Sequence, residues 1–299
     1  MKNFTDQVPQ NVTPLVAHQN ELAASQFVRI EGANLHFIIK GRGRPVVLIH
    51  GNPGSCRDWS PLYTPLAARY HVLAFDRPGH GHSERSNHGV QTTVEVQARL
   101  LSGALDELHV ERPIVVGHSW GAALALTYGL NYPVSGLVLL APAAYEGDDG
   151  VSFLSKLPAW PVIGDVLNML FTPLIGAWLV RTDVKKAFAP DSVPKNYMRH
   201  TLAEWTRPIK VKWYSIDDAL LNESLPKLSR RYAELNVPTF IVTGDSDLIV
   251  PPAENAHRLR KDLPNSELVV LPNTGHQIPL TRPEAVIDAI DRVAAISPA

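Results

Sequence analysis

Short apolar runs recur along most of the chain and predict its strands. Runs of four or five apolar residues, such as 46–49 and 136–140, are typical of strands buried on both faces of a parallel sheet. The first two runs alternate apolar and polar positions across a turn at residues 31–34, which indicates a hairpin. Eight runs are predicted to be strands: 27–30, 35–39, 46–49, 71–75, 114–116, 136–140, 238–242 and 268–271.

Helical patterns lie between most of these runs. In residues 94–108 apolar side chains recur every three or four positions, as on one buried helix face. Capping boxes are expected at Thr92 with Glu95 and at Thr281 with Glu284. The alternation of strands and helices predicts an α/β fold, a mostly parallel eight-stranded sheet with helices on both faces.

The alternation is interrupted twice, and this predicts the domain organisation. Residues 1–25 are polar and contain prolines, which favours a loose arm or a short helix packed on the body. From residue 143 to 236 the strand pattern stops, and several helical patterns broken by prolines replace it. We therefore expect a core formed by 26–142 and 237–299, with 143–236 inserted as a helical cap.

Composition narrows the classes of protein. The 299 residues, 45% of them apolar, are enough for one large core, and the net charge of −1 without long Lys/Arg blocks does not suggest a nucleic-acid surface. The single cysteine, Cys56, cannot form an intrachain disulfide. Because the N-terminus lacks the apolar core of a signal peptide, the expected location is cytoplasmic.

One pentapeptide, Gly-x-Ser-x-Gly at 117–121, joins a predicted strand to a run of helix formers. This order predicts a nucleophile elbow with Ser119 at the apex of a sharp turn. Gly117 and Gly121 would let strand and helix pass closely, because a Cβ at either position would clash. The helix N-terminus below the serine favours negative charge developing beside it.

A serine hydroxyl needs a histidine to take its proton and an acid to orient that histidine. Three histidines follow Ser119, at positions 200, 257 and 276. His276 follows the last predicted strand, so it can reach the carboxyl edge of the sheet, where sites of this kind form. His200 lies in the expected cap and His257 within a predicted helix, which makes His276 the candidate base.

Two aspartates, Asp245 and Asp247, follow the strand 238–242, and position alone nearly ties them. Gly244 is expected to make the tight turn, which leaves Asp245 where a turn would use it. Asp247 precedes the apolar stretch 248–251, which can bury its carboxylate beside the histidine. Asp247 is therefore the predicted acid.

The oxyanion of an acyl-transfer reaction needs hydrogen-bond donors. The backbone N–H of Trp120, directly after the serine, and that of Asn52, in the loop after the strand 46–49, are the candidates. Since both would donate through the backbone, their side chains are expected to be free to shape the pocket.

In this order, the motifs resemble those of the α/β-hydrolase fold across residues 26–295. The matching blocks are His50-Gly51-Asn52-Pro53-Gly54, residues 76–83, Gly117-His118-Ser119-Trp120-Gly121, residues 244–251 and Gly275-His276. The resemblance implies a catalytic triad of Ser119, Asp247 and His276 under a helical cap, with no cofactor. The pair His80-Gly81-His82 lies in a turn of the family and lacks a third ligand, so no metal is expected.

Particular branches of the family resemble parts of the sequence. The loop from His50 to Gly54 resembles that of haloalkane dehalogenases, but those enzymes use an aspartate where this chain has Ser119. Alkylation of a serine would give an ether that the same machinery cannot hydrolyse, so neither dehalogenase nor epoxide hydrolase activity is expected. The tryptophan after the serine resembles proline iminopeptidases, although no amine-binding acid stands out in the cap.

The sequence thus predicts a serine hydrolase, an esterase acting on a small apolar ester or related acyl bond. The alternatives are a carbon–carbon bond (diketone) hydrolase, an iminopeptidase-like amidase, and a binding protein or sensor on the same fold. An apolar pocket is expected, lined by residues of the cap: Val162, Ile163, Leu167, Met169, Leu170, Phe171 and Trp178. Prolines, glycines and polar residues within 161–180 argue against a membrane span. Peripheral membrane contact and the oligomeric state stay open.

Overall fold

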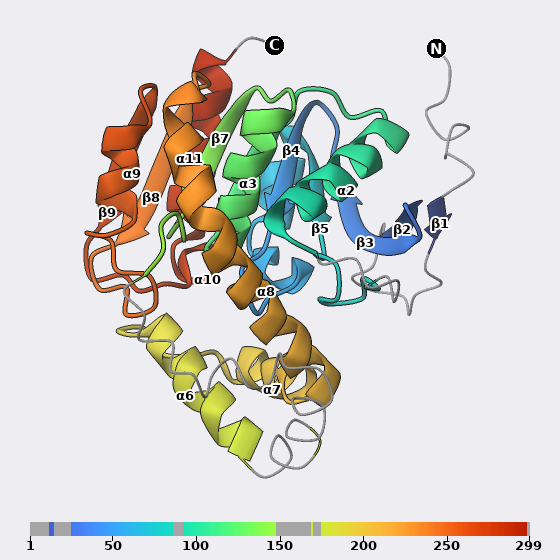
Figure 1. Cartoon of the computed structure of the whole chain (residues 1–299), viewed down its shortest axis with the longest axis vertical. Helices are drawn as coiled ribbons and strands as arrows, with labels where there is room; N and C mark the ends of the chain where they lie inside the picture. The colour runs from blue at the N-terminus through green and yellow to red at the C-terminus, as the bar shows by residue number, and fades with distance from the viewer. Residues whose placement is uncertain (1–11, 15–24, 86–91, 148–168, 170–174, 298–299) are drawn as a thin grey trace.

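The computed structural model describes residues 12–14, 25–85, 92–147, 169 and 175–297. A single nine-stranded sheet runs through the described part (Figure 1), in the order β1-β2-β3-β5-β4-β6-β7-β8-β9. The pairings from β1 to β3 and between β3 and β5 are antiparallel, and those from β5 through β4 to β9 are parallel. The strands are β1 (Val12–Pro14), β2 (Ser25–Ile30), β3 (Ala33–Lys40), β4 (Arg44–Ile49), β5 (Tyr70–Phe75), β6 (Ile114–His118), β7 (Gly136–Leu140), β8 (Thr239–Gly244) and β9 (Ser266–Leu271).

The eight predicted strands are confirmed, and β1 is an addition to them. Val12 pairs with Val28 of β2, so part of the N-terminal arm forms a strand rather than a helix or a loose segment. The reason lies in β2, whose outer edge offers unpaired N–H and C=O groups to any extended segment nearby. Residues 1–11 and 15–24 of the arm lie outside the described part.

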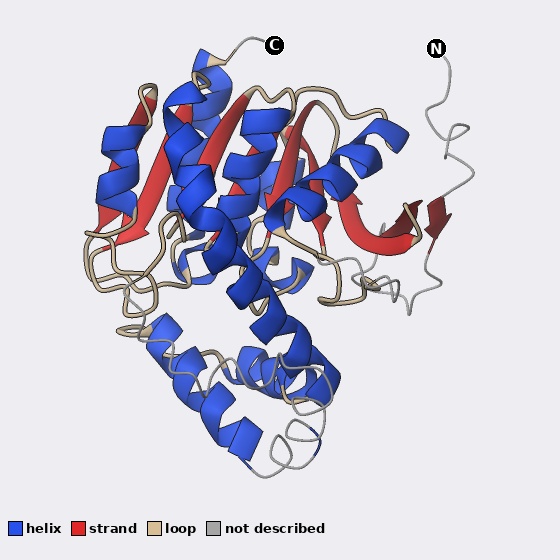
Figure 2. Ribbon diagram, in the orientation of Figure 1, coloured by secondary structure: helices blue, strands red, loops and turns tan. Residues whose placement is uncertain are grey.

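Helices cover both faces of the sheet (Figure 2), as the alternating pattern predicted. Successive strand residues point to opposite faces: Val115 packs with α2 and α3, whereas Val116 packs with the layer that contains α11. The helices of the core are α1 (Tyr63–Ala67), α2 (Val94–Glu107), α3 (Trp120–Asn131), α9 (Ala256–Asp262), α10 (Ile278–Thr281) and α11 (Pro283–Ile296), with the 3-10 turn η2 (Cys56–Trp59).

Both predicted capping boxes are wrong. Helix α2 begins one residue later than expected, since the side chain of Thr93, not Thr92, accepts a hydrogen bond from the N–H of Val96. At the last helix, Thr281 belongs to the preceding turn α10 and its hydroxyl donates to the carbonyl of Gln277 at 2.9 Å. The threonine patterns located the start of each helix to within a residue. Which residue caps the helix depends on where the preceding turn ends.

Between β7 and β8 the chain forms helices α6 (Ala177–Phe188), α7 (Lys195–Trp205) and α8 (Pro208–Leu228), then the 3-10 turn η5 (Ser229–Glu234). Figure 1 shows α6 and α7 away from the sheet, with α8 running back toward it. The carbonyl of Ala187 in α6 accepts from the N–H of Gln277, just after β9, so the inserted helices meet the carboxyl edge of the sheet. The division at residues 142 and 237 stays a prediction.

The structure describes only part of the apolar segment of the insert, residues 161–178. Most of the apolar residues expected to line a pocket lie within 148–168 and 170–174, outside the described residues. Trp178 of α6 is described, and 65% of it is exposed. No helix of the described part has both the length and the apolarity needed to cross a bilayer.

The insert also contacts the core through a buried carboxyl group. Asp58 of η2 is 5% exposed, and its carboxyl accepts from the N–H of Ser55 at 3.0 Å and from the hydroxyl of Tyr197 in α7 at 3.3 Å. Burial raises the pKa of Asp58 to about 7, against the opposing effect of these hydrogen bonds. The carboxyl is therefore neutral in much of the range in which an unfolded aspartate is charged.

The close approach of β6 and α3 predicts a stability effect. A Cβ at Gly117 would lie 2.2 Å from the carbonyl oxygen of Gly121, and backbone cannot move aside as a flexible side chain can. We expect Gly117→Ala to lower the free energy of unfolding by about 3 kcal/mol, the upper end of overpacking costs. Gly147→Ala is the control, because nothing lies within 4 Å of its Cβ position. Equal urea midpoints for the two variants would contradict the close packing.

Asp58 predicts a pH dependence of stability. The native state keeps a proton on Asp58 up to about pH 7, whereas the unfolded chain releases it near pH 4, so the free energy of unfolding falls as pH rises between those values. Asp58→Asn should reduce that fall by more than about 1.4 kcal/mol, the equivalent of one pKa unit. Asp106→Asn, at an exposed position of α2, is the control. Urea unfolding at pH 4 and pH 7 measures the effect, and parallel curves for Asp58→Asn and wild type would contradict it.

Candidate active site

Ser119 stands at a sharp turn between β6 and α3. Its backbone has φ 55° and ψ −119°, a conformation that costs energy for a residue with a side chain. The N–H of Ser119 donates to the carbonyl of Leu140 in β7, and its carbonyl accepts from the N–H of Ala122, both at 2.9 Å. A Cβ at Gly121 would lie 2.4 Å from the carbonyl oxygen of Ile49, so the helix packs directly on β4. These contacts hold Ser119 in its strained conformation.

The structure brings His276 and Asp247 together from the loops after β9 and β8. Nδ1 of His276 lies 2.7 Å from Oδ2 of Asp247. The other oxygen of Asp247 accepts from the N–H groups of Ile249 and Val250 at 2.8 and 2.9 Å. A carboxylate accepts, so Nδ1 carries the proton and Nε2 of the neutral ring is left as the acceptor.

Asp247 is kept ionised in a buried position. Burial raises the pKa of its carboxyl, but the attraction of His276, their hydrogen bond and the two backbone N–H groups outweigh this, and the net pKa is lowered. Asp245 is exposed, and its carboxylate accepts from the hydroxyl of Ser246 and the N–H of Thr274. The structure therefore pairs His276 with Asp247, the aspartate that adjoins the apolar stretch.

His118, which the sequence reasoning passed over, supports His276. Its Nε2 donates to the carbonyl of His276 at 2.9 Å, and the two ring centroids are 4.8 Å apart. Burial and the nearby His276 lower the pKa of His118 to about 3, so the ring is neutral and its Nε2–H is a fixed donor. The only signal in the sequence was its place next to Ser119.

The two residues predicted to supply oxyanion donors lie in segments that adjoin Ser119. Trp120 is the first residue of α3, so its N–H has no partner within the helix. A Cβ at Gly51 would lie 3.1 Å from Cβ of Ser119, which places the loop after β4 against the serine. In the part of the chain that the structure describes, the N–H groups of Asn52 and Trp120 donate no hydrogen bond.

The expectation that the side chains of Asn52 and Trp120 are free to shape the pocket is wrong. Nδ2 of Asn52 donates to the carbonyl of Tyr214 at 2.9 Å and to the carboxylate of Asp218 at 2.6 Å. The indole N–H of Trp120 donates to the carbonyl of Asp217 at 3.1 Å. All three acceptors belong to α8, and no local pattern in the sequence indicated that this helix would meet both residues.

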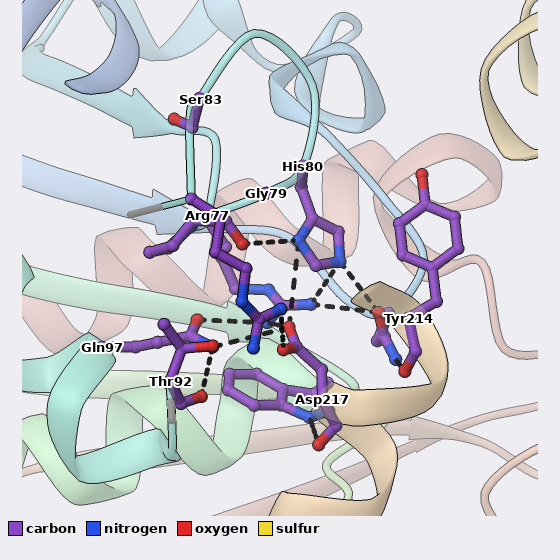
Figure 3. A network of polar contacts seen from close by, with 12 residues as sticks. Arg77, Gly79, His80, Ser83, Thr92, Gln97, Tyr214 and Asp217 are labelled. Carbon is purple, nitrogen blue, oxygen red and sulfur yellow. Dashed lines mark hydrogen bonds and ion pairs between the residues drawn. The ribbon is translucent and has the colours of Figure 1, made fainter. Parts of the chain in front are cut away.

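A buried ion pair lies at the centre of these contacts (Figure 3). Nη1 of Arg77, in the loop after β5, donates to Asp217 at 2.8 Å, and both side chains are almost fully buried. Nη1 also contacts Gln97 of α2, while the guanidinium stacks 3.9 Å from the ring centroid of Trp120. Arg85 donates to the other oxygen of Asp217 at 2.9 Å. One carboxylate of α8 thus holds two arginines of the core.

Among the residues that the structure describes, one cluster contains three groups that could bind a metal. His36, Cys56 and Asp76 are buried and their potential ligand atoms lie within 4.8 Å of one another. Each already has a partner: Nδ1 of His36 contacts Asp76 at 2.7 Å, the N–H of Cys56 donates to Asp76 at 2.7 Å, and the thiol donates to the carbonyl of Ala74. The three residues therefore already form hydrogen bonds within the core.

Comparison with known proteins agrees with this geometry. The family model described as "Alpha/beta hydrolase family" matches residues 46–289. A 2-hydroxy-6-oxononadienedioate/2-hydroxy-6-oxononatrienedioate hydrolase of Comamonas testosteroni is 28% identical over 276 residues, covering 86% of this chain and 91% of that protein.

Solved structures show the same fold. An alpha/beta hydrolase fold protein from Burkholderia ambifaria superposes with a TM-score of 0.78 at 26% identity, covering 91% of this chain and 98% of that one. An enol-lactonase from Burkholderia xenovorans gives 0.75 at 19% identity, covering 90% and 99%. The family match over most of the chain identifies this protein as a hydrolase of the alpha/beta hydrolase family.

Proposed function

We propose that the protein is a serine hydrolase that cleaves a carboxylic ester or a related acyl bond of a small molecule. The observation that carries the proposal is the 2.7 Å contact between His276 and a buried, ionised Asp247, beside the strained turn that presents Ser119. A histidine paired in this way with a buried carboxylate can take the proton of a serine hydroxyl, and the proposal assigns that proton to Oγ of Ser119. The proposal needs no cofactor.

The first half of the reaction forms an acyl-enzyme. Oγ of Ser119 attacks the carbonyl carbon of the ester while Nε2 of His276 takes the hydroxyl proton. Asp247 stabilises the resulting imidazolium through Nδ1–H. The carbonyl oxygen becomes an oxyanion, which the N–H groups of Asn52 and Trp120 would bind. His276 then returns the proton to the leaving alkoxide, and the carbon–oxygen bond to the alcohol breaks.

The second half releases the acid. Water attacks the acyl carbon, Nε2 of His276 takes a proton from it, and the same two N–H groups bind the second oxyanion. Collapse breaks the bond to Oγ of Ser119, which recovers its proton from His276. The products are a carboxylic acid and an alcohol, and the protein returns to its starting state.

The inserted helices are proposed to act as a cap over this site. The contact of α6 with the loop of His276 and the contacts of α8 with Asn52 and Trp120 support this role. A preference for apolar substrates rests on the composition of residues 161–178. The cytoplasmic location stays a prediction.

A second candidate is hydrolysis of a carbon–carbon bond next to a ketone. It is favoured by the Comamonas relative, a hydrolase named for a substrate that carries a 6-oxo group. The same triad can attack a ketone, but the leaving group is then a carbon that must be protonated. Turnover of p-nitrophenyl esters compared with 2-hydroxy-6-oxodienoates separates the two activities, and turnover of neither favours a binding protein.

Ser119 should carry the covalent intermediate. A fluorophosphonate probe should label wild-type protein at Ser119, as peptide mass spectrometry can locate, and Ser119→Ala should lose both the label and most of the turnover, on the order of 10³-fold or more. Thermal unfolding of the variant provides the folding control. Equal labelling of Ser119→Ala would refute the assignment.

The two aspartates should differ sharply. Asp247→Asn should lower kcat by about 10³- to 10⁴-fold, because an amide favours the wrong tautomer of His276 and cannot stabilise its charged form. Asp245→Asn is the matched control, since it alters an exposed carboxylate in the same loop, and its effect should be small. Both are measured at neutral pH, with circular dichroism to confirm folding; the reverse ranking would transfer the role to Asp245.

A further inference from the structure

The carbonyl of Gly51 is held by two buried donors. The N–H of Arg77 donates to Nε2 of His50 at 2.9 Å, so this nitrogen must be an acceptor. Burial and the charge of Arg77 lower the pKa of His50 to about 3, so the ring is neutral and its proton is on Nδ1. Nδ1–H then donates to the carbonyl of Gly51 at 2.8 Å, and Nη2 of Arg77 donates to the same oxygen at 3.0 Å.

Fixing this carbonyl fixes the direction of the next N–H. The peptide bond between Gly51 and Asn52 is planar and trans, so its C=O and N–H point in opposite directions. With the carbonyl directed at Arg77 and His50, the N–H of Asn52 is directed away from them. Hydrogen bonds to the carbonyl also polarise the peptide, which makes its N–H a better donor.

Both terminal nitrogens of the guanidinium are themselves held by hydrogen bonds. Asp217 of α8 neutralises it at 2.8 Å, Gln97 accepts at 3.2 Å, and the oxygen of the Asn52 side chain lies 3.3 Å from Nη2. One face of the guanidinium stacks on Trp120, the residue that supplies the other proposed oxyanion donor. Figure 3 shows Gln97 and Asp217 beside the guanidinium of Arg77. The same group therefore contacts both residues whose N–H groups flank Ser119.

We propose that Arg77 is a positioning residue of the oxyanion hole, which holds the Gly51–Asn52 peptide in its donating orientation and depends on Asp217 of the inserted helix α8 for its own position. The inference rests on the proposed function. Arg77 touches no substrate atom, and it acts through the backbone of the loop after β4. The insert thereby has two roles: it covers the site, and through Asp217 and Arg77 it orients the loop after β4.

The test compares Arg77→Gln, Arg77→Lys and Asp217→Asn with Arg85→Gln. Arg85 contacts the same carboxylate of Asp217 and stacks on Trp213, but it contacts neither Gly51 nor Asn52. Arg85→Gln therefore reproduces the loss of an ion pair with Asp217 without disturbing the peptide. Thermal unfolding of each variant reports the structural effect separately from the kinetics.

Because the oxyanion forms in the transition state and the tetrahedral intermediate but is absent from the substrate complex, Arg77→Gln should lower kcat by about ten- to a hundredfold and leave KM nearly unchanged, a smaller loss than removing a donor outright. The rate at which a fluorophosphonate labels Ser119 should fall in parallel with kcat, because the phosphoryl oxygen of the probe occupies the oxyanion hole. A trifluoromethyl ketone, which forms an oxyanion on Ser119, should bind more weakly by the same factor. Arg77→Lys should be intermediate, because one ammonium cannot reach Gly51, Asn52 and Asp217 together.

Arg85→Gln should keep the wild-type kcat, labelling rate and ketone affinity. Equal losses in Arg85→Gln and Arg77→Gln, or a loss in Arg77→Gln confined to thermal stability or to KM, would overturn the inference. If Arg77→Gln does not fold, Arg77→Lys carries the same comparison. Failure of the proposed function has a different signature, in which wild-type protein is not labelled at Ser119 at all.

Discussion

The structure depends on the close packing of strand β6 against helix α3 at the turn that carries Ser119. The Cβ positions of Gly117 and Gly121 are each occupied by backbone, so only glycine permits the approach at these two places. Since β6 lies in the middle of the parallel sheet, this turn emerges at the edge where β4, β8 and β9 also end. The loops that carry Asn52, Asp247 and His276 therefore converge on it, and none of them needs to be long.

The surroundings of three buried side chains set their protonation states. The buried rings of His50 and His118 are neutral, because burial together with the charge of Arg77 in one case and His276 in the other lowers their pKa values. Each ring can therefore donate through one nitrogen in a fixed direction. Asp247 stays ionised, because His276 and two backbone N–H groups repay its burial. Among these three side chains, the carboxylate of Asp247 is thus the one that carries a charge.

The inserted helices are joined to the core by polar contacts as well as by apolar packing, in which Leu221, Leu225 and Leu228 of α8 belong to the same buried cluster as residues of α2 and α3. Asp217 is fully buried between Arg77 and Arg85, and Nζ of Lys210 donates to the carbonyls of Gly79 and Gly81. Buried charges are costly to bring out of water unless their partners are well placed, so these contacts add little net stability but strongly disfavour other positions of α8. This suits a helix whose residues contact the loop beside Ser119.

The sequence by itself determined the alternation of strands and helices, the elbow at Ser119 and the place of His276 after the last strand, because these depend on local periodicity and on glycines required by a tight turn. It nearly tied Asp245 with Asp247, and only the tertiary structure showed which carboxylate faces the ring. It misplaced two helix caps by one residue each, and it gave no sign that the arm would add a strand. It assigned no role to Arg77, His118 or Asp217, although Arg77 and His118 lie within the motifs that it identified. Their roles arise from contacts between segments up to 158 residues apart, and no pattern within one segment records which side chain of a distant helix will meet it.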